Sequence, residues 1–227
     1  MQFKRASLKT CGDATDTVVV IDVIRAFSTA AYAFAAGVKT IALVSTVNDA
    51  IALKKQTPGA YIMGEVDGLP VSAFDFSNSP SAFDGHDLAN GFLIQRTSAG
   101  TQGIIGSKQA EHLYASSFCC ADATARCIRK QSPEMVTFVV TGDFGGGHGD
   151  EDVACADYIE ALLCGEKPEI GPFIQRVRDS HAGRLFADPA RPEFPETDLG
   201  YCLNVDRFDF AMRVYRRNGL LLMETIK

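Results

Sequence analysis

The chain has 227 residues, of which 46% are hydrophobic, and its formal net charge is −6. This length suits one large α/β domain or two closely joined lobes, and the apolar content is enough for a full core, which excludes a disordered protein. The net negative charge argues against general nucleic-acid binding, because that function requires a basic surface. A few local arginines or a metal ion could still hold a small anionic substrate.

The seven cysteines are irregularly spaced and include no C-x-x-C pair. We expect reduced, buried thiols in a cytoplasmic protein, with neither a zinc ribbon nor thioredoxin chemistry. The first ten residues lack the apolar segment of a signal peptide, and no apolar run of about 18 residues occurs. We therefore expect no membrane partner and no nucleic-acid partner. The sequence does not fix the oligomeric state, and a homodimer is compatible with it.

Strand-like and helix-like segments alternate along the chain. The β-branched run 18–21 predicts a strand buried on both faces, and 27–36 predicts a helix that stops at Gly37. Further strands are expected at 40–44, 61–63, 88–95 and 136–141, and further helices at 46–56, 103–113, 121–130 and 151–164. Residues 166–198 are expected to form a helical excursion. Residues 201–227 should return to the sheet, with a strand at 220–223 after the turn signal Asn218-Gly219. The pattern predicts one domain over 1–227 of class α/β, three-layer α/β/α, with a mostly parallel or mixed sheet.

Polar residues cluster at the joints between these elements. Because ligands bind at the carboxyl ends of parallel strands, clusters at several joints could meet in one site. The five stretches are Asp22 to Thr29, GEVDG at 64–68, FDFSNSP at 74–80, RTSAGT at 96–101 and TGDFGGGHGDED at 141–152.

These residue types fit the binding of a metal ion and an anion. Asp22, Glu65 and Asp152 offer the oxygen ligands that Mg²⁺ prefers. Arg25 offers a planar fork for a phosphate or carboxylate group. The hydroxyls and backbone N–H groups of residues 97–101 stand beside an expected helix start, which is an arrangement that binds anions.

Each stretch also has a purely structural interpretation. Asp22 and Arg25 could form an ion pair at a strand end, and GEVDG could be a solvated turn. Ser28, Thr46, Asn78 and Ser79 could cap helices, and for Thr46 we favour that interpretation. The glycine run 145–149 is typical of a mobile loop, and we assign its lone histidine, His148, no catalytic role. The coincidence of five such stretches at predicted joints favours a functional site.

Several catalytic signatures are absent from the sequence. It contains no G-x-S-x-G elbow, no phosphate-binding G-x-x-x-x-G-K-[ST] loop, no H-E-x-x-H and no G-x-G-x-x-G. These absences argue against a serine hydrolase, a P-loop NTPase, a zinc protease and a dinucleotide-dependent oxidoreductase.

The five stretches, in this order, resemble the 2-phosphosulfolactate phosphatase family. The resemblance rests on DVIRAFSTA (22–30), GEVDG (64–68), FDFSNSP (74–80), TSAGT (97–101) and the glycine-rich loop and helix of 141–163. It covers roughly the first 165 residues, and YCLNVD (201–206) extends it. The chain departs from the family pattern at Val66, where the family usually has Arg, and at Ser98 and Ala99, where it has Thr and Asn.

The resemblance implies a three-layer α/β fold and a Mg²⁺-dependent phosphatase acting on a small anionic substrate, a 2-hydroxy-acid phosphate monoester such as 2-phosphosulfolactate. Matching motif positions occur in all five stretches. To these we add Arg96, which directly precedes TSAGT, and Ser98, which stands in TSAGT where the family has Thr. We expect catalytic roles for Asp22, Arg25 and Glu65. Metal ligands are expected among Asp22, Glu65, Glu151 and Asp152, and substrate contacts among Ser28, Thr29, Asn78, Ser79, Arg96, Thr97, Ser98, Gly100 and Thr101.

Two other functions are compatible with the same residues. The first is a catalytically weakened metabolite-binding protein that uses the same anion and metal pocket, with Val66 and Ala99 marking lost catalysis. The second is a structural α/β domain of a larger assembly. In the enzymatic hypothesis a carboxylate serves as the base, and Asp22 as a covalent phosphoryl acceptor remains an alternative.

Overall fold

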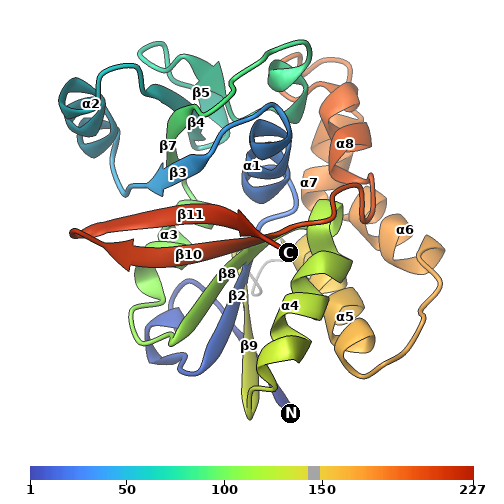
Figure 1. Ribbon diagram of the computed structural model, residues 1–227. Helices are drawn as coiled ribbons and strands as arrows, with labels where there is room; N and C mark the ends of the chain where they lie inside the picture. The colour runs from blue at the N-terminus through green and yellow to red at the C-terminus, as the bar shows by residue number, and fades with distance from the viewer. Residues whose placement is uncertain (143–148) are drawn as a thin grey trace.

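The computed structural model describes residues 1–142 and 149–227, and a mixed β-sheet runs through the molecule (Figure 1). The order of paired strands is β1-β9-β2-β8-β10-β11-β3-β7-β4-β5, and β6 pairs with β4. Over the described residues the strands are β1 (Gln2–Ala6), β2 (Thr17–Ile21), β3 (Thr40–Leu43), β4 (Tyr61–Val66), β5 (Leu69–Pro70), β6 (Phe76–Ser77), β7 (Phe92–Arg96), β8 (His112–Ser116), β9 (Met135–Val140), β10 (Ala211–Arg217) and β11 (Leu220–Ile226).

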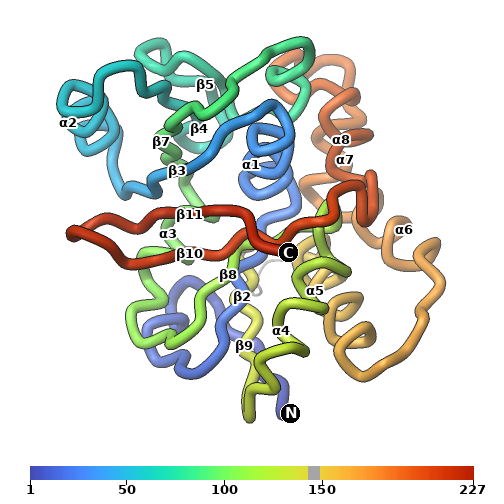
Figure 2. Tube along the Cα trace, in the orientation of Figure 1, coloured from blue at the N-terminus to red at the C-terminus, as the bar shows by residue number. Residues whose placement is uncertain are grey.

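The sheet consists of two parallel blocks joined by a hairpin. Block one contains β1, β9, β2 and β8, and block two contains β3, β7, β4 and β6. The hairpin β10–β11 pairs antiparallel to β8 on one side and to β3 on the other, so the strands of the two blocks run in opposite directions. The tube in Figure 2 shows the hairpin, in red, lying between the two blocks. The α/β class expected from the sequence is confirmed, with a mixed rather than a mostly parallel sheet.

Helices cover the sheet on both faces. They are α1 (Ala26–Ala35), α2 (Val47–Gln56), α3 (Gly100–Gly106), α4 (Ala121–Gln131), α5 (Asp150–Leu163), α6 (Gly171–Asp179), α7 (His181–Phe186) and α8 (Glu196–Cys202). In β2, Val18 and Val20 pack in the core that contains α1, whereas Val19 and Ile21 pack in the core that contains α4 and α5. This alternation places β2 in a middle layer, as the uninterrupted β-branched run predicts.

The helix expected at 103–113 is wrong. The structure has the short helix α3, which ends at Gly106, followed by β8. In β8, Leu113 and Ala115 face one core and Tyr114 faces the other, which is the period of a strand. The sequence HLYAS is too short to distinguish the two periods. The sequence analysis also did not find β1.

Two local signals are confirmed. Thr46 caps α2 through a capping box, in which its side chain accepts from the Asp49 N–H and the Asp49 carboxylate accepts from the Thr46 N–H. Asn218 and Gly219 have φ values of 52° and 76° and form the two-residue turn between β10 and β11.

Residues 166–198 contain α6, α7 and the start of α8, which lie beside α5 and α1 at the right of Figure 1. Among the described residues, no helix has the length and apolar character that crossing a membrane would require.

Candidate functional site

Asp22 follows β2 directly, and its side chain is only 6% exposed. Its Oδ1 accepts a hydrogen bond of 2.9 Å from the N–H of Ala26, the first residue of α1. A Cβ added at Gly100 would lie 2.8 Å from Asp22 Oδ2 and 2.8 Å from the Ala26 Cβ. The start of α3 therefore approaches Asp22 so closely that only glycine fits without a shift, and the first and fourth polar stretches meet here.

The electrostatic environment of Asp22 is unusual. Burial, together with the nearby carboxylates of Glu65 and Glu151, raises the pKa of Asp22 to about 7. The N–H groups of Ala26 and Gly100 oppose this rise because they favour the charged form. Two acidic side chains from two other stretches thus repel the charged form of Asp22, and a cation would relieve this repulsion.

Glu65 lies near the end of β4 and is 6% exposed. Its Oε2 accepts a hydrogen bond from the Gly68 N–H, and its Oε1 accepts one from the Ser98 N–H. Glu65 therefore connects the GEVDG turn to the RTSAGT stretch. The preceding Gly64 has φ of 136°, and a Cβ there would lie 1.8 Å from the Arg96 carbonyl oxygen, so the residue must be glycine for β4 and β7 to meet this way.

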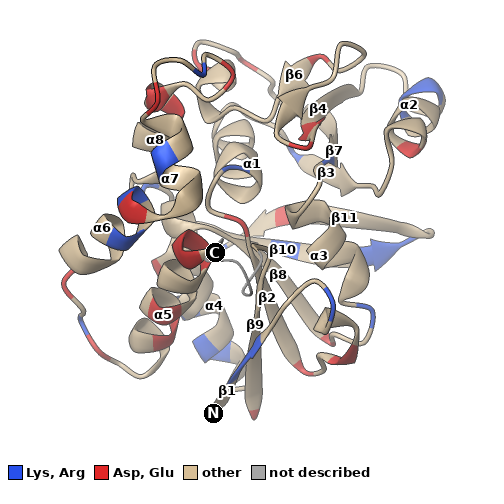
Figure 3. Ribbon diagram, turned by 180° about the vertical axis from the view of Figure 1, so that it is seen from behind, with Lys and Arg blue, Asp and Glu red and all other residues tan. Residues whose placement is uncertain are grey.

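Glu151 and Asp152 lie in the first turn of α5 and are both buried. The two oxygens of Asp152 accept hydrogen bonds from the N–H groups of Val23, Thr141 and Gly142 and from the Thr141 hydroxyl. Burial and the neighbouring carboxylates of Glu151 and Asp22 raise the pKa of Asp152, and the hydrogen bonds from the Val23 N–H and the Thr141 hydroxyl oppose this rise. Asp152 thus joins α5 to the ends of β2 and β9. Figure 3 shows acidic segments, in red, before α1 and at the start of α5 near the centre of the molecule.

Arg25 lies beside a cavity of about 200 Å³. Its Nη1 donates a 2.7 Å hydrogen bond to the carboxylate of Asp198, a residue with no exposed surface. The cavity is lined by Arg25, Glu65, Gly68, Pro70, Ser77, Asn78, Ser79, Pro192, Glu193 and Pro195. The first, second and third stretches therefore share one cavity, and residues 192–195 close it from the helical excursion.

Two predicted substrate contacts, Asn78 and Ser79, line this cavity. Asn78 is 6% exposed, and its Oδ1 has no hydrogen-bond partner within the described part of the chain. An unsatisfied buried amide oxygen is costly, so its position at a cavity wall is consistent with a bound donor. Ser79 donates a 2.8 Å hydrogen bond to Asp198.

The RTSAGT stretch is mostly engaged within the protein. The N–H groups of Thr97 and Thr101 donate to each other's hydroxyl oxygens, and the Ser98 N–H donates to Glu65. The Arg96 guanidinium donates to the carbonyl oxygens of Ser45 and Glu65 and to the Ser98 hydroxyl. These groups hold the loop in place and leave few donors for an anion.

Ser28 and Thr29 are buried in the first turn of α1. The Ser28 hydroxyl donates to the Val23 carbonyl, and Thr29 Oγ1 has no hydrogen-bond partner among the described residues. Asp75, in the third stretch, pairs with Lys54 on α2 and accepts from the Ile62 N–H. His148 and most of the glycine run lie outside the described residues.

The excursion contributes to the site through residues that no sequence motif indicates. Asp198, Phe186 and Phe194 all contact Arg25, although they are separated from it by more than 150 residues in the chain. No motif marks them, because a helix in a peripheral segment gives no indication of where it packs. Within 1–142 and 149–227, no cluster of three or more His, Cys, Asp or Glu residues is arranged as a ready-made metal site.

The comparisons with known proteins agree with one another. The family model described as 2-phosphosulpholactate phosphatase matches residues 3–216. A relative from Bacillus subtilis, named probable 2-phosphosulfolactate phosphatase, is 36% identical over 93% of this chain and 92% of its own length. Relatives with the same name from Carboxydothermus hydrogenoformans and Thermoplasma acidophilum are 30% and 24% identical, over 92% and 83% of this chain and 90% and 81% of their own.

Proposed function

Because the chain belongs to the 2-phosphosulfolactate phosphatase family, we propose that it is a Mg²⁺-dependent phosphatase of a small 2-hydroxy-acid phosphate monoester, 2-phosphosulfolactate or a related compound. The observation that carries this proposal is the environment of Asp22, where burial and then the carboxylates of Glu65 and Glu151 raise its pKa to about 7, while Glu65 shares a cavity wall with Arg25.

The residues present fit a magnesium ion. Mg²⁺ is commonly held by only one or two carboxylates, with water and substrate oxygens completing its coordination, so a cluster of three acidic ligands is not required. Asp22 and Glu65 are the first candidates to hold the ion, with Glu151 next to them. The Asp152 oxygens already accept four hydrogen bonds, and we therefore assign Asp152 the role of fixing the start of α5. When bound, the ion would neutralise charge on the phosphoryl group and lower the pKa of a water molecule.

We place the substrate in the 200 Å³ cavity, which is a suitable size for a three-carbon acid ester. The Arg25 guanidinium would pair with a phosphoryl or carboxylate oxygen. The Asn78 amide and the Ser79 hydroxyl would orient the substrate, and Glu65 is held at the same wall by the Gly68 and Ser98 N–H groups.

Asp22 is the candidate base. In the arrangement in which Glu65 and Glu151 hold the ion, the ionised Asp22 carboxylate would accept a proton from the attacking water. Attack by Asp22 itself on phosphorus, with formation of an acyl phosphate, is the alternative. Both assignments require the charged side chain.

Phosphate release from a panel of phosphorylated 2-hydroxy acids, with and without Mg²⁺, tests the proposal. We expect Mg²⁺-dependent turnover by the wild-type protein and none above background by Asp22→Asn. Asp157→Asn is a matched control, because Asp157 forms ion pairs with Arg5 and Arg176 on the outer side of α5. Undiminished turnover by Asp22→Asn would remove Asp22 from the mechanism.

The departures at Val66 and Ala99 favour one second candidate, a metabolite-binding protein that has lost catalysis. Binding of a phosphorylated hydroxy acid that raises the melting temperature, without release of phosphate, would select it.

A further inference from the structure

Asp198, which belongs to none of the sequence motifs, accepts several hydrogen bonds from residues at the cavity. Its Oδ2 accepts from Arg25 Nη1 at 2.7 Å, and its Oδ1 accepts from the hydroxyls of Ser79 and Ser81 at 2.8 and 2.6 Å. Its side chain is completely buried. One carboxylate on α8 therefore holds residues from two distant segments, of which Arg25 and Ser79 line the cavity.

The orientation of Arg25 is fixed on three sides. Asp198 holds Nη1, and the guanidinium carbon lies 4.8 Å from the centre of the Phe186 ring and 5.7 Å from that of Phe194. Within the described part of the chain, the hydrogen bond of Nη2 is a long one, 3.5 Å to the Gly68 carbonyl oxygen. Because the guanidinium is planar and its donors are rigidly arranged, fixing Nη1 and one face determines where Nη2 points. Nη2 is thus a donor that a ligand in the cavity can use.

We propose that Asp198 is the positioning residue of this site: from the helical excursion it aims Arg25 Nη2 into the cavity and holds Ser79 at the cavity wall. Only the kinetic test of this inference depends on the proposed phosphatase function. It assigns the segment 186–198 a role in binding the substrate anion, although this segment contains none of the motifs discussed above.

The kinetic test is a double-mutant cycle. Asp198→Asn removes the charge but keeps a side-chain oxygen that can accept a hydrogen bond from Arg25 Nη1, which an alanine cannot do. We expect Asp198→Asn to lower kcat/KM about 10- to 100-fold, mainly through KM, because a misaimed donor binds the anion poorly. In an Arg25→Met background the same change should cost no more than about twofold. Independent, multiplicative losses would overturn the proposal.

The second test needs no substrate. Arg25→Ala leaves a space bounded by Asp198 and the Phe186 and Phe194 rings, which is a binding site for a free guanidinium group. Methylguanidinium, well below concentrations that unfold the protein, should raise the melting temperature of Arg25→Ala but not of Arg25→Ala/Asp198→Asn. It should also restore turnover only in the single variant. Equal responses of the two variants, or no response in either, would overturn the role of Asp198.

The kinetic test and the melting-temperature test distinguish failure of the proposed function from failure of the role of Asp198. If the wild-type protein releases phosphate from no hydroxy-acid ester, the proposed function fails, and the melting-temperature arm still decides whether Asp198 positions a guanidinium. Asp157→Asn in the same Arg25→Ala background is the control and should respond to methylguanidinium as Arg25→Ala does, since Asp157 pairs elsewhere.

Discussion

Gly100 is the residue at which the closest approach in the site can be tested. An alanine Cβ there would lie 2.8 Å from Asp22 Oδ2 and 2.8 Å from the Ala26 Cβ, which displaces the carboxylate or α3. We expect Gly100→Ala to lower kcat/KM roughly 10- to 100-fold, because small displacements of catalytic groups are costly. Steady-state kinetics checks this. Gly171→Ala is the control, since no atom lies within 4 Å of its added Cβ. If Gly100→Ala has the kinetics of the wild-type protein, α3 can shift to accommodate the added Cβ without disturbing catalysis.

The raised pKa of Asp22 makes stability depend on pH. Its ordinary value is 3.8 and its folded value is about 7, so the folded state binds the proton more tightly. The resulting stabilisation is complete below the ordinary value and is lost as pH rises through about 7. The loss is on the order of 4 kcal/mol.

The variant Asp22→Asn isolates this effect, because an asparagine carries no proton to lose and can keep the acceptor for the Ala26 N–H. In the absence of metal, its free energy of unfolding should increasingly exceed that of the wild-type protein between about pH 4 and pH 7 and stay level above that range. Urea unfolding at a series of pH values measures the difference. A constant difference would mean that Asp22 is ionised throughout.

Residue identity could be predicted for much of the candidate site, because acids and hydroxyls at strand ends are recognisable in the sequence. The hydrogen-bond partners of each residue, and therefore its role, could not be predicted. The Asp152 oxygens accept four hydrogen bonds and the Arg96 guanidinium binds carbonyl groups, and these partners are set by tertiary packing. Asp198 could not be found at all, because its partners lie 119 and 173 residues away.

At the scale of single elements, local chemistry predicted α2 well. The capping box of Thr46 and Asp49 satisfies backbone N–H groups at the start of this helix. We expect Thr46→Ala to lower the free energy of unfolding by about 1 kcal/mol. The change should leave kcat/KM unaltered, because α2 contributes nothing to the cavity lining. Chemical denaturation and an activity assay check the two expectations together, and a loss of activity without a loss of stability would contradict them.

The elements that sequence patterns missed are short. Strands β1 and β8 each have five residues, and α3 has seven. At these lengths a strand and a helix have nearly the same apolar pattern, and the choice between them depends on neighbours in the sheet. The long, periodic segments α4 and α5 and the buried strands β2 and β9 were predicted to within a residue or two.

At the scale of the whole molecule, the hairpin β10–β11 is the only pairing between the two parallel blocks in the described strand order. A chain that stops after Phe210 keeps every residue discussed in the candidate site, yet we expect it to be inactive and largely unfolded. Circular dichroism and the phosphate-release assay test this expectation.

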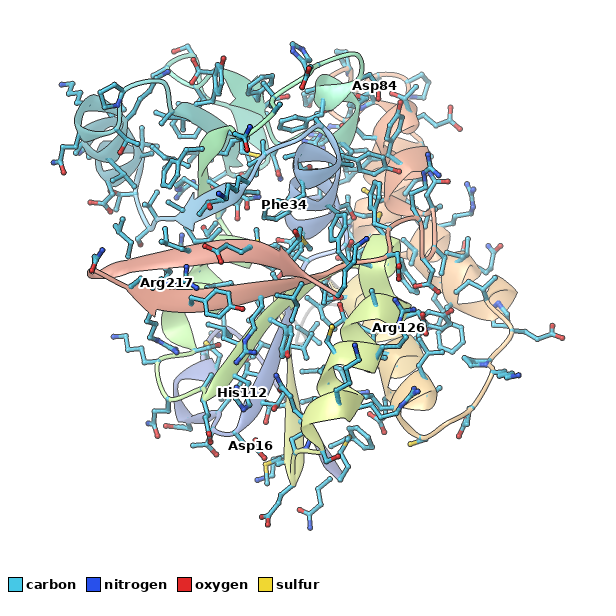
Figure 4. The ribbon with its side chains drawn as sticks, in the orientation of Figure 1. Asp16, Phe34, Asp84, His112, Arg126 and Arg217 are labelled. Atoms are coloured by element: carbon cyan, nitrogen blue, oxygen red, sulfur yellow. The ribbon has the colours of Figure 1, made fainter. Side chains whose placement is uncertain are left out.

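A gentler change at the hairpin is Gly219→Val, where φ is 76°. A β-branched side chain is strained in that backbone region, so we expect a loss of about 1 kcal/mol or more in stability. The melting temperature should fall while KM stays unchanged, because the turn lies far from the cavity. Figure 4 shows Arg217, next to this turn, at the tip of the hairpin and Asp84 on the opposite side of the molecule beside α8. An altered KM would mean that the joint between the blocks also adjusts the site.

The position of this hairpin in the chain has a consequence for synthesis. Strands of the two blocks leave the ribosome interleaved: β1 and β2, then β3 to β7, then β8 and β9, and the pair that connects them comes after all of these. Until residues 211–226 emerge, β8 and β3 each present an open edge to any neighbouring nascent chain. A slow translation step or a chaperone acting before residue 211 would therefore determine how much of this protein escapes aggregation.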